Sequence, residues 1–266
     1  EGYELNIQPH EIFITGGSEA GIFYGLQTLR QLVVAYNGVI PCGYIADEPT
    51  FAYRGVHFDV SRHFFSVEDV KRYIDILAAH KVNRLHWHLT DDQGWRIEIK
   101  KYPQFAEQGG FRGGDAKLHP IYGRFNQKYG GYYTQDELRD IVAYAAQRNI
   151  EVIPEIDMPG HSQYFDKTFG FPMASEEGMK VLEKCLKEFM DEIPAEDCPY
   201  IHIGSDEVYI ADPQGFMQFC EGIVREGGRT PMAWYPGLPS DEGTISQIWS
   251  EAGRVAAGTD FPGRYV

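Results

Sequence analysis

FAYRGVHFDVSRHFFSVEDVKRYIDILAAHKVNRLHWHL, residues 51–89, contains two predicted strands separated by one predicted helix. We expect the strands at Tyr53–Val60 and Asn83–Leu89. Between them, Ser66 can cap a helix with Asp69 three residues further on. An apolar stripe at helical spacing follows the cap: Val70, Tyr73, Ile74 and Leu77. A helix that connects two strands in this way implies a parallel pair with the helix outside the sheet.

The same alternation continues along the chain. Further strands are predicted at Glu151–Ile156, Tyr200–Ile203, Pro231–Trp234, Thr244–Trp249 and Gly258–Val266. Helices between them are indicated by a Thr134/Glu137 cap and by apolar stripes that begin at Met179 and Phe216. The sequence thus predicts seven strands. We interpret them as an eight-stranded (β/α)8 TIM barrel whose last strand is missing from this chain. The alternative is an open doubly wound sheet, but the first turn, residues 60–64, lacks the Gly-rich phosphate sequence that such a sheet favours.

Residues 1–46 differ from this pattern. They predict a short hairpin at residues 3–7 and 11–15, followed by a helix over residues 21–34. The buried side of that helix is predicted to carry Phe23, Leu26, Leu29, Leu32 and Val33. Two strands and a helix are too few for a separate core. We therefore expect the C-terminal part of a small α/β domain at 1–46, a linker over 47–50, and the barrel over 47–266.

Composition excludes several classes of partner. The formal net charge is −15, so nucleic acid and anionic membranes, which need a basic surface, are poor partners. The apolar runs are too short to predict a membrane span. The four cysteines form no CxxC pair, which leaves no support for a zinc or redox motif. Both disulfides and free thiols remain open, and neither compartment nor oligomeric state follows from the sequence.

Polar residues gather where the predicted barrel strands end. Active sites of such barrels lie at the carboxyl ends of the strands. The first four ends carry charged or imidazole side chains: Arg62 and His63; His88, Asp91 and Asp92; Asp157 and His161; Asp206 and Glu207. The next three ends carry Trp234, Trp249 and Tyr265. This combination predicts a pocket for a polar ligand with faces that can stack on aromatic rings.

The sequence His202-Ile203-Gly204-Ser205-Asp206-Glu207 places two adjacent carboxyls after an apolar strand. Adjacent side chains project differently, so the pair is not expected to straddle one scissile bond. If Asp206 stays ionised, its charge favours the protonated form of Glu207, which a general acid needs. An ordinary two-carboxylate glycosidase would instead recruit Asp157 or Asp92 as the nucleophile.

Four stretches of the chain resemble glycoside hydrolase family 20, the β-N-acetylhexosaminidases. They are RGVHFDVSRHF (54–64), HWHLTDDQGW (86–95), PEIDMPGH (154–161) and HIGSDEV (202–208), in the family's order. The resemblance implies hydrolysis of terminal β-linked N-acetylhexosamine by substrate-assisted catalysis, with no cofactor or metal. It also implies an oligosaccharide or glycoconjugate substrate, and a secreted, periplasmic or lysosomal location.

The resemblance also implies roles for individual residues. Glu207 would be the general acid, and Asp206 would hold the substrate's acetamido group. Arg62 would bind the sugar hydroxyls, while Trp234, Trp249 and Tyr265 would line the pocket. Asp157, His161 and His88 would form a supporting shell, whereas His86 is expected in the core.

Two departures from the family pattern are present. Ser205 stands where glycine is commoner, and the chain ends before the strand that brings a further tryptophan and an acidic residue. Two other functions remain as alternatives. One is a non-catalytic sugar-binding relative, although Glu207 is retained. The other is a metal-dependent barrel hydrolase, suggested by His86-x-His88 with Asp91 nearby.

Overall fold

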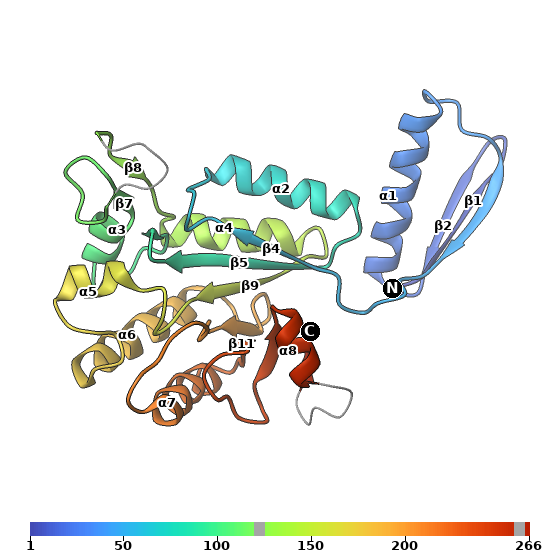
Figure 1. Ribbon diagram of the computed structural model, residues 1–266. Helices are drawn as coiled ribbons and strands as arrows, with labels where there is room; N and C mark the ends of the chain where they lie inside the picture. Colours follow the sequence, from blue (N-terminus) through green and yellow to red (C-terminus); the bar gives the residue numbers. More distant parts are fainter. Residues whose placement is uncertain (120–125, 258–263) are drawn as a thin grey trace.

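The computed structural model describes residues 1–119, 126–257 and 264–266. The chain forms a small antiparallel sheet with one helix, followed by a larger layer of parallel strands and helices (Figure 1). The small unit lies beyond the amino ends of the barrel strands. Within the described ranges, no helix is both long and apolar enough to cross a membrane.

The small unit contains three strands and not the two that the sequence predicts. β1 (Tyr3–Ile7) pairs with both β2 (Ile12–Gly16) and β3 (Gly43–Asp47), all antiparallel. The predicted hairpin is confirmed. The linker predicted over residues 47–50 is wrong at its first residue, because β3 extends through Asp47. One face of the sheet packs on α1 (Glu19–Ala35) around a core of Tyr3, Leu5, Ile7 and Tyr24.

The buried face predicted for α1 is partly wrong. Leu26 is 48% exposed and Val33 is 42% exposed, whereas the fully buried positions of the helix are Gly21, Tyr24 and Gly25. A Cβ added at Gly25 would lie 2.6 Å from the Ile14 side chain. The helix therefore approaches the sheet along its glycines, and this close approach turns two of the larger apolar side chains outward.

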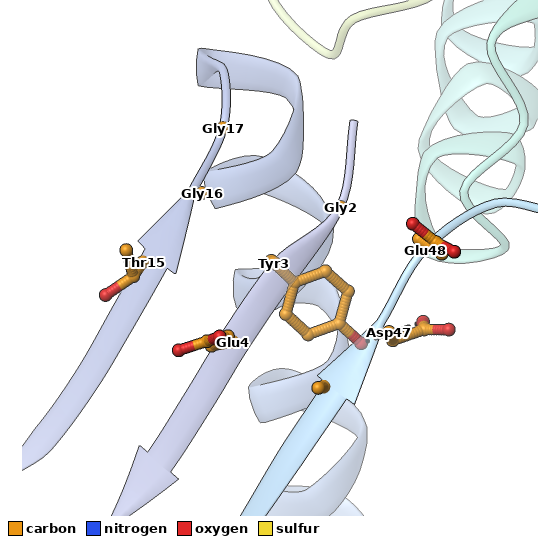
Figure 2. A pocket seen from close by; sticks show the side chains of 9 residues that line it. Gly2, Tyr3, Glu4, Thr15, Gly16, Gly17, Asp47 and Glu48 are labelled. Carbon is orange, nitrogen blue, oxygen red and sulfur yellow. Dashed lines mark hydrogen bonds between the residues drawn. The ribbon is translucent and has the colours of Figure 1, made fainter.

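The small unit is joined to the barrel by a polar contact. Lys81 donates to the Tyr3 hydroxyl at 2.9 Å and to Oδ2 of Asp47 at 2.9 Å. Figure 2 shows the Tyr3 hydroxyl next to Asp47, at the edge of a shallow hollow that Glu4 and Glu48 also line. This hollow belongs to the small unit and lies away from the predicted strand-end site.

The larger layer confirms the predicted barrel-like architecture. Among the described residues, seven parallel strands form one curved sheet in the order β4, β5, β9, β10, β11, β12, β13. Their bounds are Gly55–Asp59, Arg84–Asp91, Glu151–Ile156, Tyr200–His202, Thr230–Tyr235, Ile245–Ile248 and Arg264–Tyr265. The predicted last strand, residues 258–266, falls mostly outside the described residues.

Helices follow the strands. They are α2 (Val67–Ala79), α4 (Gln135–Ala146), α6 (Glu176–Glu192), α7 (Pro213–Glu226) and α8 (Glu251–Ala257). The first four were predicted, whereas α8 was not. Ser66 caps α2 through the Asp69 N–H, and Thr134 and Glu137 form a reciprocal capping box on α4. The main core lies between these helices and the sheet. All four cysteines are free: Cys42 is exposed, and Cys185, Cys198 and Cys220 are buried.

Short elements that the sequence does not predict extend the carboxyl ends of the strands. They are β6 (Gly94–Trp95), α3 (Gln104–Gly109), β7 (Phe111–Arg112), β8 (Tyr129–Gly130) and α5 (Gln163–Phe169). Figure 1 shows α3, α5, β7 and β8 at the end of the sheet opposite the small unit. Stacking of Trp95 on Phe105 and packing of Tyr164 against both rings hold this layer together.

Candidate active site

A row of polar side chains crosses the inside of the curved sheet. The strand register pairs Asp59 with His88, His88 with Glu155, and Glu155 with His202. Residues in register on neighbouring strands share a face. On β5 the alternate residue Trp87 instead packs into the core towards the helices. The row therefore faces the lumen, at the level where a barrel builds its site.

Glu155 is the centre of this row and is fully buried. Its Oε2 lies 2.6 Å from Nδ1 of His88 and 2.7 Å from Nε2 of His86. Its Oε1 accepts a 2.7 Å hydrogen bond from the indole N–H of Trp234 on β11. The sequence patterns predict no role for Glu155 and a core position for His86, yet His86 points at this carboxylate. The available signal was a carboxylate inside the apolar run of β9, which is costly unless it is paired.

The surroundings fix the charges of the row. Burial opposes the ionised form of Glu155, but His88, His202 and His86 outweigh it and hold its pKa well below the usual range. Burial also opposes the charged form of His88, whereas Glu155 and Asp91 raise the pKa of His88 well above its usual value. Burial lowers the pKa of His86 and of His202. At neutral pH the row thus contains a carboxylate–imidazolium pair flanked by two neutral histidines.

Arg62 lies just after β4, at the predicted strand end. Its Nη2 is 2.7 Å from Oδ2 of Asp91, and its Nη1 is 3.0 Å from Oδ2 of Asp59. Burial opposes its charge, but Asp91 and Asp59 outweigh this and raise the pKa of Arg62. The side chain remains 35% exposed. A guanidinium has five N–H donors, so Arg62 can be held by two carboxylates and still donate to ligand hydroxyls.

His161 lies between carboxyls from different strands. Its Nδ1 is 3.6 Å from Oδ1 of the buried Asp91. Its Nε2 is 3.3 Å from Oε2 of Glu207 and 3.9 Å from Oδ2 of Asp206. The Glu207 side chain is 58% exposed, whereas burial raises the pKa of the more enclosed Asp206 against the opposing effect of His161. The structure thus places the predicted His161 beside both members of the predicted catalytic pair, and adds Asp91 behind it.

The turn after β10 has an unusual backbone. Gly204, Ser205 and Glu207 have φ values of 64°, 87° and 50°. A Cβ at Gly204 would lie 1.8 Å from Oδ1 of Asp157, so glycine is required there. The Ser205 N–H donates to the same oxygen at 3.2 Å. Asp157 is buried, and this burial together with nearby carboxylates raises its pKa well above the usual range. Asp157 therefore holds the turn, and its part in a supporting shell around the general acid stays a prediction.

Replacing Ser205 by glycine is expected to raise the free energy of unfolding by about 1 kcal/mol. A φ of 87° is unfavourable for a residue with a Cβ, and the buried Ser205 hydroxyl has no hydrogen-bond partner among the described residues. Denaturant unfolding would measure the change. Ser246→Gly, at a buried serine in strand β12, is the control and should destabilise. If the free energy of unfolding of Ser205→Gly were lower than that of the wild type, the conclusion that Ser205 is strained would be wrong.

The three predicted aromatic residues differ in how they are placed. Trp234 is anchored by Glu155, and its ring packs 4.6 Å from the His202 ring and 5.2 Å from the His86 ring. Trp249 follows β12, is 46% exposed and donates its indole N–H to the carbonyl of Pro236. Tyr265 is in β13, but its side chain lies outside the described part of the structure. Of the two whose side chains the structure describes, Trp234 alone hydrogen-bonds to the polar row.

Some of these side chains could hold a divalent cation by their spacing. Ligand atoms lie within 4.8 Å of one another in the groups His57/His86/Glu155, His88/Glu155/Asp157, Asp91/Asp92/His161 and Asp157/His161/Asp206. Imidazole and carboxylate ligands suit several transition metals. In the His86-x-His88 motif, however, both rings hydrogen-bond to the same oxygen of Glu155. The hydrogen bonds therefore account for the arrangement of this motif without a metal.

Several known proteins are similar to this chain in sequence or in structure. A β-hexosaminidase of Porphyromonas gingivalis is 43% identical over 256 residues, which cover 86% of this chain and 32% of that protein. A Vibrio harveyi GH20 exo-β-N-acetylglucosaminidase, solved with N-acetylglucosamine, matches with a TM-score of 0.86 and 33% identity, covering 94% of this chain and 47% of that one. A Streptomyces plicatus N-acetyl-β-hexosaminidase, solved with Thio-NAglucal, matches with a TM-score of 0.79 and 35% identity, covering 95% and 56%. The chain thus spans a third to somewhat over half of these relatives.

Two family profiles match separate parts of the chain. Residues 51–170 match "Glycosyl hydrolase family 20, catalytic domain", and residues 1–48 match "Glycosyl hydrolase family 20, domain 2". Together the two matches include more than half of the residues. With its parallel barrel strands and the four sequence stretches that run through their carboxyl ends, the chain belongs to glycosyl hydrolase family 20.

Proposed function

We propose that the full-length protein removes terminal β-linked N-acetylhexosamine residues, GlcNAc or GalNAc, from glycans. The observation that carries this proposal is the contact of His161 with Glu207 on one side and the buried Asp91 on the other, beside the half-buried Asp206. The names of the relatives, and the N-acetylglucosamine bound in the Vibrio harveyi structure, support the same substrate class.

In the first step Glu207 donates a proton to the glycosidic oxygen, and the bond from that oxygen to the anomeric carbon breaks. The carbonyl oxygen of the substrate's own acetamido group forms a new bond to the anomeric carbon, which gives an oxazolinium ion. The Asp206 carboxylate accepts a hydrogen bond from the acetamido N–H and stabilises the positive charge that develops on the oxazolinium ion. The exposed position of Glu207 suits contact with a leaving group, and the enclosed position of Asp206 suits contact with the acetamido group.

In the second step water attacks the anomeric carbon and gives a proton to the Glu207 carboxylate. The bond to the acetamido oxygen breaks, and the anomeric configuration is retained because the carbon is inverted twice. His161 is placed to orient Glu207 in both steps, and a carboxylate oxygen of Asp91 lies 3.6 Å from the other ring nitrogen. Substrate-assisted catalysis of this kind departs from the two-carboxylate scheme of most glycosidases.

Binding of the sugar is assigned to the residues around this pair. Arg62 has free donors for ring hydroxyls and is held in place by Asp59 and Asp91. Trp234 presents a ring whose indole N–H is fixed by a buried carboxylate. Trp249 and Tyr265 complete the aromatic wall in this proposal.

The direct test is an assay of the full-length protein on chromogenic β-GlcNAc and β-GalNAc substrates. We expect hydrolysis with retention, detected by NMR of the first-formed anomer, and competitive inhibition by a compound that mimics the oxazoline. A folded protein that binds N-acetylglucosamine but hydrolyses neither substrate would favour the non-catalytic sugar-binding alternative. Hydrolysis that the oxazoline mimic does not inhibit would refute substrate assistance.

Removing divalent cations with EDTA is expected to leave kcat and KM of the full-length protein unchanged, since no step above uses a metal. Metal analysis of the purified protein before and after treatment provides the control. A loss of activity that returns on adding zinc would instead support the metal-dependent alternative, at one of the histidine–carboxylate groups described above.

A further inference from the structure

Arg96 is a fully buried arginine whose partners are main-chain carbonyls. Its Nε donates to Val60 O at 3.0 Å and its Nη2 to Ser61 O at 2.6 Å. Its Nη1 donates to Gly110 O at 2.6 Å and to Gly131 O at 2.9 Å. The guanidinium thus joins the segment after β4 to the base of the β7–β8 layer.

Arg96 differs from Arg62 in that its described hydrogen bonds all go to main-chain carbonyls, and its Cζ lies 5.6 Å from the centroid of the Phe64 ring. Among the residues that the structure describes, no carboxylate lies within salt-bridge distance of Arg96. Burial, and to a lesser degree Arg112, lowers the pKa of Arg96 to about 10, so it remains charged at neutral pH. A Cβ at Gly94 would lie 2.4 Å from Cζ of Arg96, which shows how tightly the guanidinium is enclosed. Burying such a charge is costly unless its donors are paired, and four of the five N–H groups of Arg96 donate to these carbonyls.

Two of the four carbonyls that Arg96 binds, those of Val60 and Ser61, belong to the two residues before Arg62. The same short segment is held from the other side by Asp59, whose Oδ1 accepts the N–H groups of Ser61 and Arg62, each at 2.9 Å. The Ser61 hydroxyl also donates to Gly94 O at 2.7 Å. The backbone that presents Arg62 is therefore fixed by hydrogen bonds on both its N–H and its C=O groups.

We propose that Arg96 is a positioning residue for sugar binding, which fixes the Val60–Ser61 backbone so that Arg62 meets the ring hydroxyls of the substrate. Arg96 itself is buried behind this segment and does not touch the sugar. Lysine cannot replace it, because one ammonium has three donors at a single point and cannot reach four carbonyls in a planar arrangement. The inference rests on the proposed function, since it assigns Arg62 to the substrate.

The test compares Arg96→Lys with the wild type in the full-length protein. Because Arg96→Lys should misplace Arg62, we expect KM for the β-GlcNAc substrate to rise by about 10- to 100-fold, with a much smaller change in kcat. The inhibition constant of free N-acetylglucosamine should rise in parallel. In an Arg62→Ala background, Arg96→Lys should add little to the KM, because the group that it positions is already gone.

Arg229 offers a matched control. It is also a buried arginine that binds carbonyls, those of Cys198, Gly227, Met190 and Ile193, but it lies before β11 at the amino end of the strands. Arg229→Lys should lower the melting temperature as Arg96→Lys does while leaving KM unchanged. Equal KM effects of the two variants would reduce Arg96 to a general structural role and overturn the proposal.

A second readout does not depend on activity. Hydrogen exchange of the Ser61 and Arg62 amides should become at least about tenfold faster in Arg96→Lys than in Arg229→Lys. An unchanged KM and unchanged exchange in Arg96→Lys would refute the positioning role while leaving the hexosaminidase proposal intact. If the wild type itself is inactive on both sugars, the proposed function fails, and the exchange rates alone decide whether Arg96 fixes this segment.

Discussion

Glu207→Gln should lower kcat/KM on a β-GlcNAc disaccharide by about 10²–10⁴ while the protein stays folded. Glutamine has nearly the same shape but no proton to give to the leaving oxygen. The Glu207 side chain is mostly exposed, and its described polar contact is with His161 at 3.3 Å, so the substitution should change stability little. Steady-state kinetics with circular dichroism as a check on folding would measure this.

The leaving group provides the sharper comparison. An aryl glycoside whose phenolate leaves readily needs little protonation, and kcat/KM reports the step in which this bond breaks. The loss in Glu207→Gln should therefore be much smaller for the aryl substrate than for the disaccharide. Glu226→Gln, at an exposed glutamate at the end of α7, is the control and should lose nothing on either substrate. Equal losses on both substrates would be evidence against Glu207 as the acid.

Local sequence signals were sufficient to predict most of the strands and helices of the barrel. Caps such as Ser66 and Thr134 mark where α2 and α4 begin, and both act as the sequence predicts. The short strands β6 to β8 were missed because two residues carry no periodicity. The buried face of α1 was predicted wrongly because this helix packs on the sheet through its glycines. The spacing of apolar residues gives no sign that small residues are the buried ones.

The candidate site was predictable as a set of strand ends but not as a network. The rule that polar residues collect at the carboxyl ends pointed to Arg62, Asp157 and His161. Glu155 lies deeper in the lumen than these strand ends. Its importance comes from its hydrogen bonds with His88 on β5 and Trp234 on β11. Sequence spacing does not contain such cross-strand contacts. The link from Asp91 to His161 was missed for the same reason.

Glu155→Gln should lower the free energy of unfolding by about 3–5 kcal/mol at neutral pH, since it leaves the buried His88 imidazolium without one partner. For a protein of this size the melting temperature should fall by roughly 10 °C. The indole of Trp234 would also lose a charged acceptor, so activity should fall as well. Differential scanning calorimetry together with the β-GlcNAc assay would measure both effects.

The pH dependence of this loss distinguishes a charge effect from a packing effect. The pKa of Glu155 is held well below its unfolded value of about 4.3, so its ionised form stabilises the folded state above that pH. This contribution is lost as the pH falls through the lower, folded pKa. The difference between wild type and Glu155→Gln should therefore be full at neutral pH and shrink in acid. Glu221 is a suitable control, because burial raises its pKa instead, and Glu221→Gln should be nearly neutral or stabilising at pH 7. A difference for Glu155→Gln that stays constant down to strongly acidic pH would mean that shape, and not charge, makes Glu155 the centre of the site.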